Sequence, residues 1–468
     1  MPGRVRSFLA RAAGATLIVF GLALGPAVGD GLRSDALPLP SAAPRLDPEP
    51  LAPTRLDCQR LAPATPVPRP PAPFGPAVLV DRGGLAMGNF YASLSEAAAG
   101  RGIARIMYFG DSHVASDLMT GRIRHNLQSR FGDGGVGFVL PMKPLRWYGH
   151  ADLEIGRSSG WDVLAVRKSH DLERRVGPSG FALLAHESAT SSFRLRTSDQ
   201  GIKRRAQLQV YYMKQPAGGH VQLTIDGQDV KTWSTSSEGM TEEPGYYETT
   251  LRRMPEQVEV GALGDGPVVL YGLTLERSGA GVVLDTLGIP GARAKEQLLT
   301  DDEMYREHLG KRDPSLIVLS YGTNEGTDTG EPMELFEEHL RQVIARLKDA
   351  APRSSCMIVG PTDHPQRVGR GYRARKRTGQ IIEVERRIAG ENSCGFIDLV
   401  GVMGGTMSMM RMVNEHFAGP DHTHFTRRGY EALADAISGA MVNGWNTWQK
   451  SSCTRESRAD KTLTAPAQ

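Results

Sequence analysis

The sequence predicts an α/β fold of three layers, in which a parallel sheet lies between helices and an all-β sandwich interrupts it. Short apolar runs alternate with amphipathic helical stretches over residues 86–149 and again over residues 280–446. This alternation is typical of a parallel sheet that helices cover on both faces. Residues 150–279 instead contain short runs of alternating apolar and polar residues and no long helical window, which predicts antiparallel strands. The α/β core is therefore expected to be discontinuous in sequence.

The expected elements follow one another in βα order. The first unit is a helix over 90–99, a strand over 104–109, a tight turn at 110–113 and a helix over 114–130. After the sandwich, strands are expected over 282–288, 316–321, 356–360 and 396–399, with helices over 294–309, 332–350, 375–388 and 426–442. The helices are recognised by apolar residues that recur about every four positions.

The composition excludes several classes of protein. The net charge is +3 over 468 residues, which is too small to indicate nucleic-acid binding, so no nucleic-acid partner is expected. The four cysteines are too few and too widely spaced for a zinc-finger array or a dense disulfide scaffold. His, Cys and carboxylate residues do not cluster at the spacings of zinc or iron sites. We therefore expect neither a metal nor another cofactor.

The N-terminal residues 1–29 have the pattern of a signal peptide. Arg4, Arg6 and Arg11 precede an uncharged apolar run that extends from Ala12 to Gly29. A cleaved signal predicts a periplasmic or secreted protein. An uncleaved one would anchor the chain in a membrane, and no stable membrane partner is expected otherwise.

Two flanking segments are predicted to be disordered. Residues 30–85 are rich in proline and poor in large apolar residues, which is typical of an extended spacer. Residues 447–468 are polar and aperiodic, and we expect them to fray.

Export would allow disulfide bonds to form. Cys356 and Cys394 each begin a predicted strand. If those strands are parallel neighbours, the two Cα atoms come within disulfide reach, which is under about 7 Å. Cys58 and Cys453 lie in the flanking segments and either pair with each other or stay free.

Four polar motifs each follow a predicted strand or precede the last helix. They are Gly110-Asp111-Ser112-His113, Ile289-Pro290-Gly291-Ala292, Gly322-Thr323-Asn324-Glu325 and Asp421-His422-Thr423-His424. Open parallel sheets bind ligands at the carboxyl ends of their strands. The four motifs are therefore expected to meet at one edge of the sheet.

Together these motifs supply the groups that acyl transfer requires. A serine hydroxyl is a weak nucleophile and needs an adjacent base, so Ser112 would attack while His424 takes its proton. Asp421 would hold the imidazole tautomer and stabilise the imidazolium. The oxyanion needs preorganised donors, for which the N–H groups of Ser112 and Gly291 and the amide of Asn324 are candidates. Each motif alone is equally explained by a turn or a helix cap, and only their combination indicates catalysis.

Three alternatives remain open within these motifs. Gly288 competes with Gly291 as the glycine donor, because the register of the second motif is uncertain. His422 is a second histidine in the last motif, but the spacing of three residues favours His424 as the base and leaves His422 at the rim. His113 either contacts the substrate or fills the turn.

The order of the motifs resembles the SGNH (GDSL-type) esterase superfamily, whose blocks carry Ser, Gly, Asn and a final Asp-x-x-His. The resemblance covers about residues 90–149 and 280–442. The stretches 109–117, 131–138 and 421–430 look most like those of exported bacterial peptidoglycan O-acetylesterases, which carry a sandwich resembling a carbohydrate-binding module where this chain has its insert. The resemblance implies a flavodoxin-like three-layer sandwich and removal of acetyl groups from peptidoglycan, or another acetylated glycan, through an acetyl-enzyme.

Two other functions remain open. The same acetyl-enzyme could pass its acyl group to a sugar hydroxyl, which would make the protein an O-acetyltransferase of a cell-wall or exported polysaccharide. The chain could also be a non-catalytic wall-binding protein. A basic cluster, made up of Arg367, Arg370, Arg373, Arg375, Lys376 and Arg377, is either a solvated face or a contact for anionic groups of a wall polymer.

Overall fold

The structure is a computed structural model that describes residues 69–81, 84–167, 175–196 and 204–463, with side chains up to residue 452. The predicted signal peptide, Cys58, the spacer before residue 69 and residues 464–468 lie outside the described residues. No described helix combines the length and the apolar character needed to cross a membrane.

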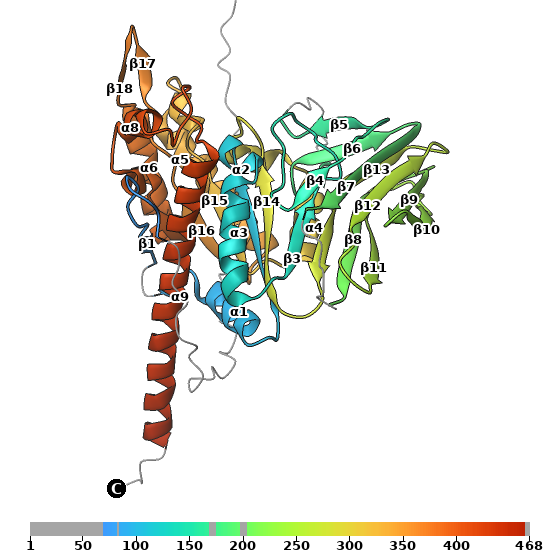
Figure 1. The fold of residues 1–468 in the computed structure, drawn as a ribbon, viewed down its shortest axis with the longest axis horizontal. Helices are drawn as coiled ribbons and strands as arrows, with labels where there is room; N and C mark the ends of the chain where they lie inside the picture. The colour runs from blue at the N-terminus through green and yellow to red at the C-terminus, as the bar shows by residue number, and fades with distance from the viewer. Residues whose placement is uncertain (1–68, 82–83, 168–174, 197–203, 464–468) are drawn as a thin grey trace, which may run out of the picture. The chain divides into compact units, whose positions relative to one another are not determined.

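A six-stranded sheet forms the centre of the α/β core, in the order β1-β19-β16-β15-β2-β14 (Figure 1). Its strands are β1 (Leu79–Val80), β2 (Ile103–Gly110), β14 (Gly281–Gly288), β15 (Leu316–Ser320), β16 (Ser355–Val359) and β19 (Gly395–Ile397). β14, β2, β15, β16 and β19 are parallel to one another. β1 joins the edge of the sheet antiparallel to β19. The predicted parallel sheet is confirmed and gains an antiparallel edge strand.

Helices cover both faces of this sheet because successive strand side chains point to opposite sides. Ile106 and Tyr108 face one apolar cluster, whereas Met107 and Phe109 face another. The first cluster includes α1 (Gly88–Ala98), α3 (Leu118–Phe131) and α9 (Arg427–Leu463), and the second includes α4 (Asp302–Arg312), α5 (Met333–Ala350) and α6 (Lys376–Glu391). The result is the predicted three-layer arrangement.

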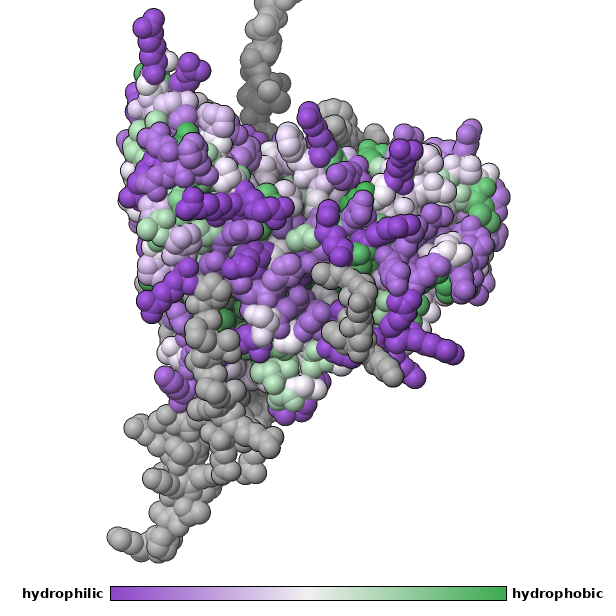
Figure 2. All heavy atoms as spheres, viewed as in Figure 1, coloured by the Kyte–Doolittle hydropathy of each residue, from purple (hydrophilic) through white to green (hydrophobic). Residues whose placement is uncertain are grey.

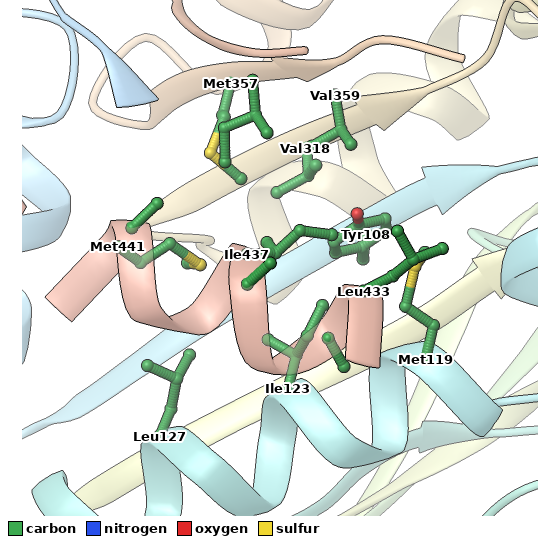
Figure 3. Packing of buried hydrophobic residues seen from close by; sticks show 14 of the residues in the cluster. Tyr108, Met119, Ile123, Leu127, Val318, Met357, Val359, Leu433, Ile437 and Met441 are labelled. Atoms are coloured by element: carbon green, nitrogen blue, oxygen red, sulfur yellow. The ribbon is translucent and has the colours of Figure 1, made fainter. Parts of the chain in front are cut away.

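The packing of α9 shows how this burial stabilises the core. Leu433, Ile437 and Met441 recur every four residues along α9 and face the strands beside α3 (Figure 3). All three are fully buried. Burying one such side chain contributes about 1.5–3 kcal/mol relative to leaving it exposed.

The predicted helix over 114–130 is divided into α2 (Ser112–Ala115) and α3. The break lies at Asp117, which adopts a left-handed backbone conformation with φ of 56°. Its buried carboxylate accepts hydrogen bonds from Thr120 Oγ1, Arg124 Nη2 and the backbone N–H of Ala151. These contacts hold the break between α2 and α3, and Ala151 lies too far along the chain to be predicted from the local pattern.

The predicted helix over 294–309 is also divided. It consists of a 3-10 helix, η2 (Ala294–Leu299), followed by α4. The Asp301 side chain caps α4 by accepting a hydrogen bond from the Met304 N–H. The sequence did not predict four further short features in the connections of the core. They are η3 (Glu325–Thr327), the hairpin of β17 (Gln366–Val368) and β18 (Gly371–Arg373), α7 (Leu399–Met403) and α8 (Ser408–Asn414).

The insert consists of two antiparallel sheets that enclose one apolar cluster. One sheet has the order β10-β9-β12-β7-β4 and the other the order β11-β8-β13-β6-β5, with β3 paired to β13. The strands are β3 (Gly135–Val139), β4 (Leu153–Ile155), β5 (Asp162–Ala165), β6 (Phe181–Ala185), β7 (Ser188–Leu195), β8 (Ala206–Lys214), β9 (His220–Ile225), β10 (Gln228–Ser234), β11 (Glu243–Leu251), β12 (Gln257–Leu263) and β13 (Val268–Arg277).

The two-sheet insert begins earlier than the sequence predicted. The sheet that contains β13 also contains β3, so its strands start at Gly135 and not after the expected boundary at residue 150. Every residue of β3 is buried. A strand buried on both faces lacks the alternation that marks a half-exposed strand, which explains why the pattern did not reveal it.

A buried ionic network joins the insert to the core. Arg312 of α4 donates to Asp285 of β14 at 2.8 Å and to Glu276 of β13 at 2.8 Å. Arg105 of β2 donates to the same Glu276 at 2.8 Å. Burial alone would raise the pKa of Glu276, but the charges of the two arginines outweigh it and lower that pKa to about 2. The second apolar cluster also extends across this boundary, through Phe138 among others.

The predicted disordered segments differ from the structure at their inner ends. Phe74, within the predicted spacer 30–85, is 6% exposed and meets the Phe417 ring edge-on at 5.1 Å. Leu79 and Val80 form β1. At the other end, α9 continues to Leu463 through most of the predicted tail 447–468. Composition predicts disorder from the average of a segment and does not register a single aromatic residue that finds a partner.

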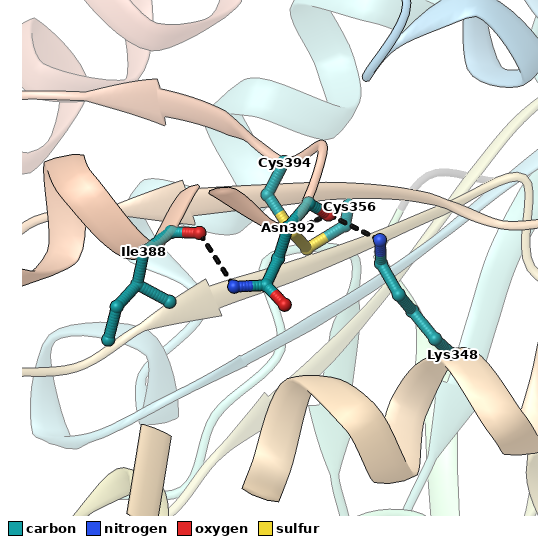
Figure 4. The surroundings of a disulfide bond; sticks show 5 residues. All are labelled: Lys348, Cys356, Ile388, Asn392 and Cys394. Carbon is teal, nitrogen blue, oxygen red and sulfur yellow. Dashed lines mark hydrogen bonds between the residues drawn. A yellow bond between two sulfur atoms is a disulfide. The ribbon is translucent and has the colours of Figure 1, made fainter. Parts of the chain in front are cut away.

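The predicted disulfide between Cys356 and Cys394 is confirmed, with the two Cα atoms 4.5 Å apart (Figure 4). Cys356 lies in β16 and Cys394 directly precedes the neighbouring parallel strand β19. The pairing of Cys58 with Cys453 lies outside the described residues, because Cys58 and the Cys453 side chain are not among them.

We predict that the double variant Cys356→Ala/Cys394→Ala loses about 4 kcal/mol of unfolding free energy, from the chain-entropy relation for a loop of this length. The two cysteines are separated by 38 residues, and the bond restricts the unfolded chain. Urea denaturation of the variant against the wild type measures the loss. The matched control is Cys58→Ala/Cys453→Ala, which retains the Cys356–Cys394 bond, and an unchanged midpoint in the first variant would contradict the prediction.

Candidate active site

Three strands of the central sheet end at the same level. Gly110 at the end of β2 is in register with Gly288 of β14 and with Ser320 of β15. A Cβ atom on Gly288 would lie 2.3 Å from the backbone nitrogen of Ala115, so only glycine lets β14 approach α2 this closely. The loops with the first three motifs therefore leave the sheet side by side, as the sequence predicted.

The loop after β2 presents Ser112 as the first residue of α2. Asp111 caps this helix by accepting a hydrogen bond from the backbone N–H of His113 at 2.9 Å. Asp111 is 1% exposed, and this burial raises the pKa of its carboxyl to about 6. Because α2 has only one turn, the position of Ser112 depends on this cap and on the break at Asp117.

Ser112, His424 and Asp421 form a continuous hydrogen-bonded chain. The Ser112 Oγ lies 2.8 Å from His424 Nε2, and His424 Nδ1 lies 2.7 Å from Asp421 Oδ2. Since Asp421 can only accept when it is ionised, the ring proton resides on Nδ1 and leaves Nε2 to accept from the serine. The structure thus brings Ser112 next to His424, which lies 312 positions later in the sequence, and to its neighbour Asp421.

The ionised state of Asp421 has a clear physical origin. Burial would raise the pKa of this carboxyl, but hydrogen bonds from the His424 ring and from the backbone N–H groups of His424 and Thr423 outweigh it and hold the pKa below its usual value. The side chains of His424 and Asp421 are 45% and 52% exposed. The imidazole is therefore oriented by a charged partner and is still open to solvent.

His422 does not take part in this chain. Its Nδ1 lies 2.9 Å from the carbonyl oxygen of Pro420, and its ring stacks on Tyr372 with the centroids 4.1 Å apart. This position at the rim agrees with the choice of His424 as the residue that meets Ser112.

The Asn324 amide links the first three motifs. Its Nδ2 donates to the carbonyl oxygen of Ala292 at 2.9 Å and to Asp111 Oδ2 at 3.2 Å. Asn324 therefore lies beside the loops of both Ser112 and Gly291, as expected for a donor near the nucleophile. Both of its amide N–H groups already have partners, and the bond to Asp111 is the longer one.

Gly291 fits the predicted donor better than Gly288. Gly291 follows β14 in a turn with φ of 76°, and its N–H meets no acceptor within the described part of the chain. Gly288 is the last residue of β14 and is paired in the sheet with Gly110. The competing assignment to Gly288 is thus disfavoured, because that residue serves the close approach of α2.

Glu325 is a residue of the site that the sequence did not single out. Its buried carboxylate accepts from the backbone N–H of Ala294 at 2.8 Å and from that of Gly322 at 2.9 Å. Burial raises the pKa of Glu325 to about 7. It ties the loop after β14 to the loop after β15. In the sequence, only the position of Glu325 directly after Asn324 could have indicated that it belongs to the site.

His113 is buried beside the chain formed by Ser112, His424 and Asp421. It is 5% exposed, its Nδ1 lies 3.1 Å from the Tyr430 hydroxyl, and its Nε2 lies 3.5 Å from Thr362 Oγ1. Burial lowers the pKa of His113 to about 3, so the ring is neutral. Of the two roles left open for His113, this burial favours the one in which it fills the turn, where its ring centroid lies 5.4 Å from that of the His424 ring.

Within the described ranges, three or more His, Cys, Asp or Glu side chains do not gather in a group that could hold a metal ion.

A comparison with protein families gives one match. Residues 257–432 match the GDSL-like lipase/acylhydrolase family. This range contains Gly291, Asn324, Asp421 and His424 but not Ser112, because the insert separates the first motif from the others. The match supports a carboxylic ester hydrolase. No curated protein sequence matches it.

Solved structures support the SGNH hydrolase fold. A structure described as "Peptidoglycan O-acetylesterase in action" matches with a TM-score of 0.67 and 23% identity, over 79% of this chain and 99% of that one. A family two carbohydrate esterase from Cellvibrio japonicus matches with a TM-score of 0.26 and 10% identity, over 62% and 99% of the two chains. An acetyl xylan esterase has a TM-score of 0.26 and 16% identity, over 34% and 79%. The last two scores are too low to support any argument.

We predict that Tyr430→Phe lowers the unfolding free energy of the hydrolase by about 1–3 kcal/mol, because the variant leaves the buried Nδ1 of His113 without a partner. Since the His113 side chain is buried, KM for an acetyl ester should stay near the wild-type value. Chemical denaturation and steady-state kinetics measure the two effects. A raised KM with unchanged stability would return His113 to the substrate side.

Proposed function

We propose that the hydrolase removes O-acetyl groups from peptidoglycan through an acetyl-enzyme. The observation that carries the proposal is the chain from Ser112 through His424 to Asp421, with contacts of 2.8 and 2.7 Å. It lies on a fold that matches 99% of a structure described as a peptidoglycan O-acetylesterase, which supports an acetylated glycan as the substrate.

In the first step, Ser112 Oγ attacks the carbonyl carbon of the acetyl ester. The serine proton passes to His424 Nε2, and Asp421 stabilises the imidazolium that forms. The tetrahedral oxyanion accepts hydrogen bonds from the N–H groups of Ser112 and Gly291. The bond between the acyl carbon and the sugar oxygen then breaks, and that oxygen takes the proton from His424. The glycan leaves with a free hydroxyl, and the acetyl group remains on Ser112.

Asn324 has a distinct part in this step. One of its amide N–H groups would leave the longer bond to Asp111, 3.2 Å, and turn to the oxyanion. The other would keep its bond to the Ala292 carbonyl oxygen, which holds the side chain in place. The amide then gains its additional partner only when negative charge develops, as a catalytic donor should.

In the second step, water attacks the acetyl-enzyme. His424 takes a proton from the water and returns it to Ser112, and acetate leaves. The 45% exposure of the His424 side chain lets water reach the position next to Nε2. This openness favours hydrolysis over transfer of the acetyl group to a second sugar hydroxyl.

The disulfide supports a periplasmic or secreted location. The chain contains the disulfide Cys356–Cys394. Disulfides persist in oxidising compartments and are rare in the cytosol. We further propose that the two-sheet insert binds glycan. Its apolar cluster and the network around Arg312 attach it firmly to the core, so a bound strand would be held in a defined orientation.

Ser112→Ala should lose nearly all release of acetate from O-acetylated peptidoglycan, because the nucleophile is absent. Acetate is measured with intact and with chemically de-acetylated peptidoglycan as substrates, and circular dichroism confirms the folded state. A variant that releases acetate at the wild-type rate would exclude the proposed mechanism.

For Asn324→Ala we expect kcat for an acetyl ester to fall by about 10²–10³-fold, the usual effect of removing one oxyanion donor. KM should change much less, since the contact forms mainly in the transition state. The matched control is Thr327→Ala, which removes an exposed side chain from the same turn. Equal kcat in the two variants would show that Asn324 does not stabilise the oxyanion.

A further inference from the structure

A hairpin with a strong positive charge stands at the same edge of the sheet as the catalytic residues. It consists of β17 and β18 and the turn between them, residues 366–373, and is called the basic hairpin below. It follows the carboxyl end of β16 and projects from the core beyond α8 (Figure 1). Figure 2 shows strongly hydrophilic side chains at its position.

The basic hairpin is attached to the loop that carries His424. Its Tyr372 ring stacks on the His422 ring, with the centroids 4.1 Å apart and the planes 23° apart. His422 is two residues before His424 and is itself held by the Pro420 carbonyl oxygen. The stack therefore fixes one strand of the hairpin against the catalytic loop.

The segment after the hairpin is attached to the loop that carries Asn324. Arg377 donates to the carbonyl oxygen of Glu325 at 2.8 Å, and Arg375 lies 3.5 Å from that of Gly326. The hairpin and the segment that follows it thus contact both the loop of His424 and the loop of Asn324. A purely solvated surface feature would need neither set of contacts.

Three arginines of the hairpin carry charge that the protein does not neutralise. Arg367, Arg370 and Arg373 are exposed, and none of them forms an ion pair with an acidic side chain in the described part of the chain. Exposed Arg387 of α6, by contrast, pairs with Glu337 at 2.5 Å. The guanidinium groups of the basic hairpin are therefore available to an anionic ligand, and their planar donors match carboxylates in particular.

We propose that the basic hairpin binds carboxylates of the polymer next to the acetyl ester that is cleaved. This inference rests on the proposed function, because peptidoglycan carries free carboxylates on the peptides attached to its sugars. The hairpin would raise the affinity for polymer over small esters and orient the strand with respect to Ser112. Phosphate groups of other wall polymers have the same anionic chemistry, and the experiment separates the two sources.

The main test compares wild type with Arg367→Ala/Arg370→Ala/Arg373→Ala on O-acetylated peptidoglycan at low ionic strength. We expect KM to rise about tenfold, since exposed charge pairs contribute about 0.2–1 kcal/mol each. Values are expressed relative to turnover of a small uncharged acetate ester, which offers no carboxylate. The difference should disappear at about 0.5 M salt, where exposed charges are screened.

The matched control is Arg367→Lys/Arg370→Lys/Arg373→Lys, which retains the charges and should keep most of the wild-type KM. Equal KM for wild type and the alanine variant at low salt would overturn the proposal. Two further substrates identify the anion. When the peptides are removed from the glycan, the KM of the wild type should no longer be lower than that of the alanine variant. If this difference in KM is lost only when phosphate polymers are removed, the assignment to carboxylates is overturned.

A binding measurement keeps this inference separate from the proposed function. Cosedimentation with peptidoglycan compares Ser112→Ala with the same variant carrying the three arginine-to-alanine changes, and it requires no turnover. Weaker binding of the second protein supports the hairpin even if the wild type releases no acetate from the polymer. Equal binding refutes the hairpin even if acetate is released.

Discussion

The site depends on the alignment of three parallel strands. Gly110, Gly288 and Ser320 lie in register, so the loops that carry Ser112 and Asn324, and the turn at Gly291, begin at one level. A slip of one residue in a strand would exchange its two faces. It would also expose Met107 and Phe109 to the wrong helices, so the apolar clusters on both sides enforce the register. Catalytic geometry is in this sense a consequence of core packing.

Buried carboxylates hold the loops in place once the strands have aligned them. Asp111 bridges the backbone of α2 and the Asn324 amide, Glu325 bridges two loops, and Asp117 fixes the break before α3. Burial raises the pKa values of Asp111 and Glu325 to about 6 and about 7. Burial removes water from each carboxyl group, which costs free energy. The hydrogen bonds that the group accepts are stronger in this low-dielectric setting and offset that cost. Groups with such shifted pKa values cluster at functional sites.

The insert and the core are joined more closely than the sequence suggests. β3 lies between the two in the chain, pairs with β13, and is buried throughout. Arg312 connects α4 to strands on both sides of the boundary. If the proposed function holds, a joint of this kind would let the insert and the core contact one polymer strand in a fixed geometry. The basic hairpin, at the edge where His424 lies, would add a third contact on the same principle.

The sequence by itself determined the order of the elements, the four motifs and the roles expected of Ser112, Asp421 and His424, and it made Cys356 and Cys394 candidates for a disulfide. These follow from local periodicity and from the rule that parallel strands present their carboxyl ends together. The tertiary structure alone decided that Phe74 packs in the core, that β3 pairs with β13 of the insert, and that the His113 ring is buried next to Tyr430. Each of these depends on a partner distant in sequence. A local pattern encodes the period of an element, but it has no signature for a contact between residues hundreds of positions apart.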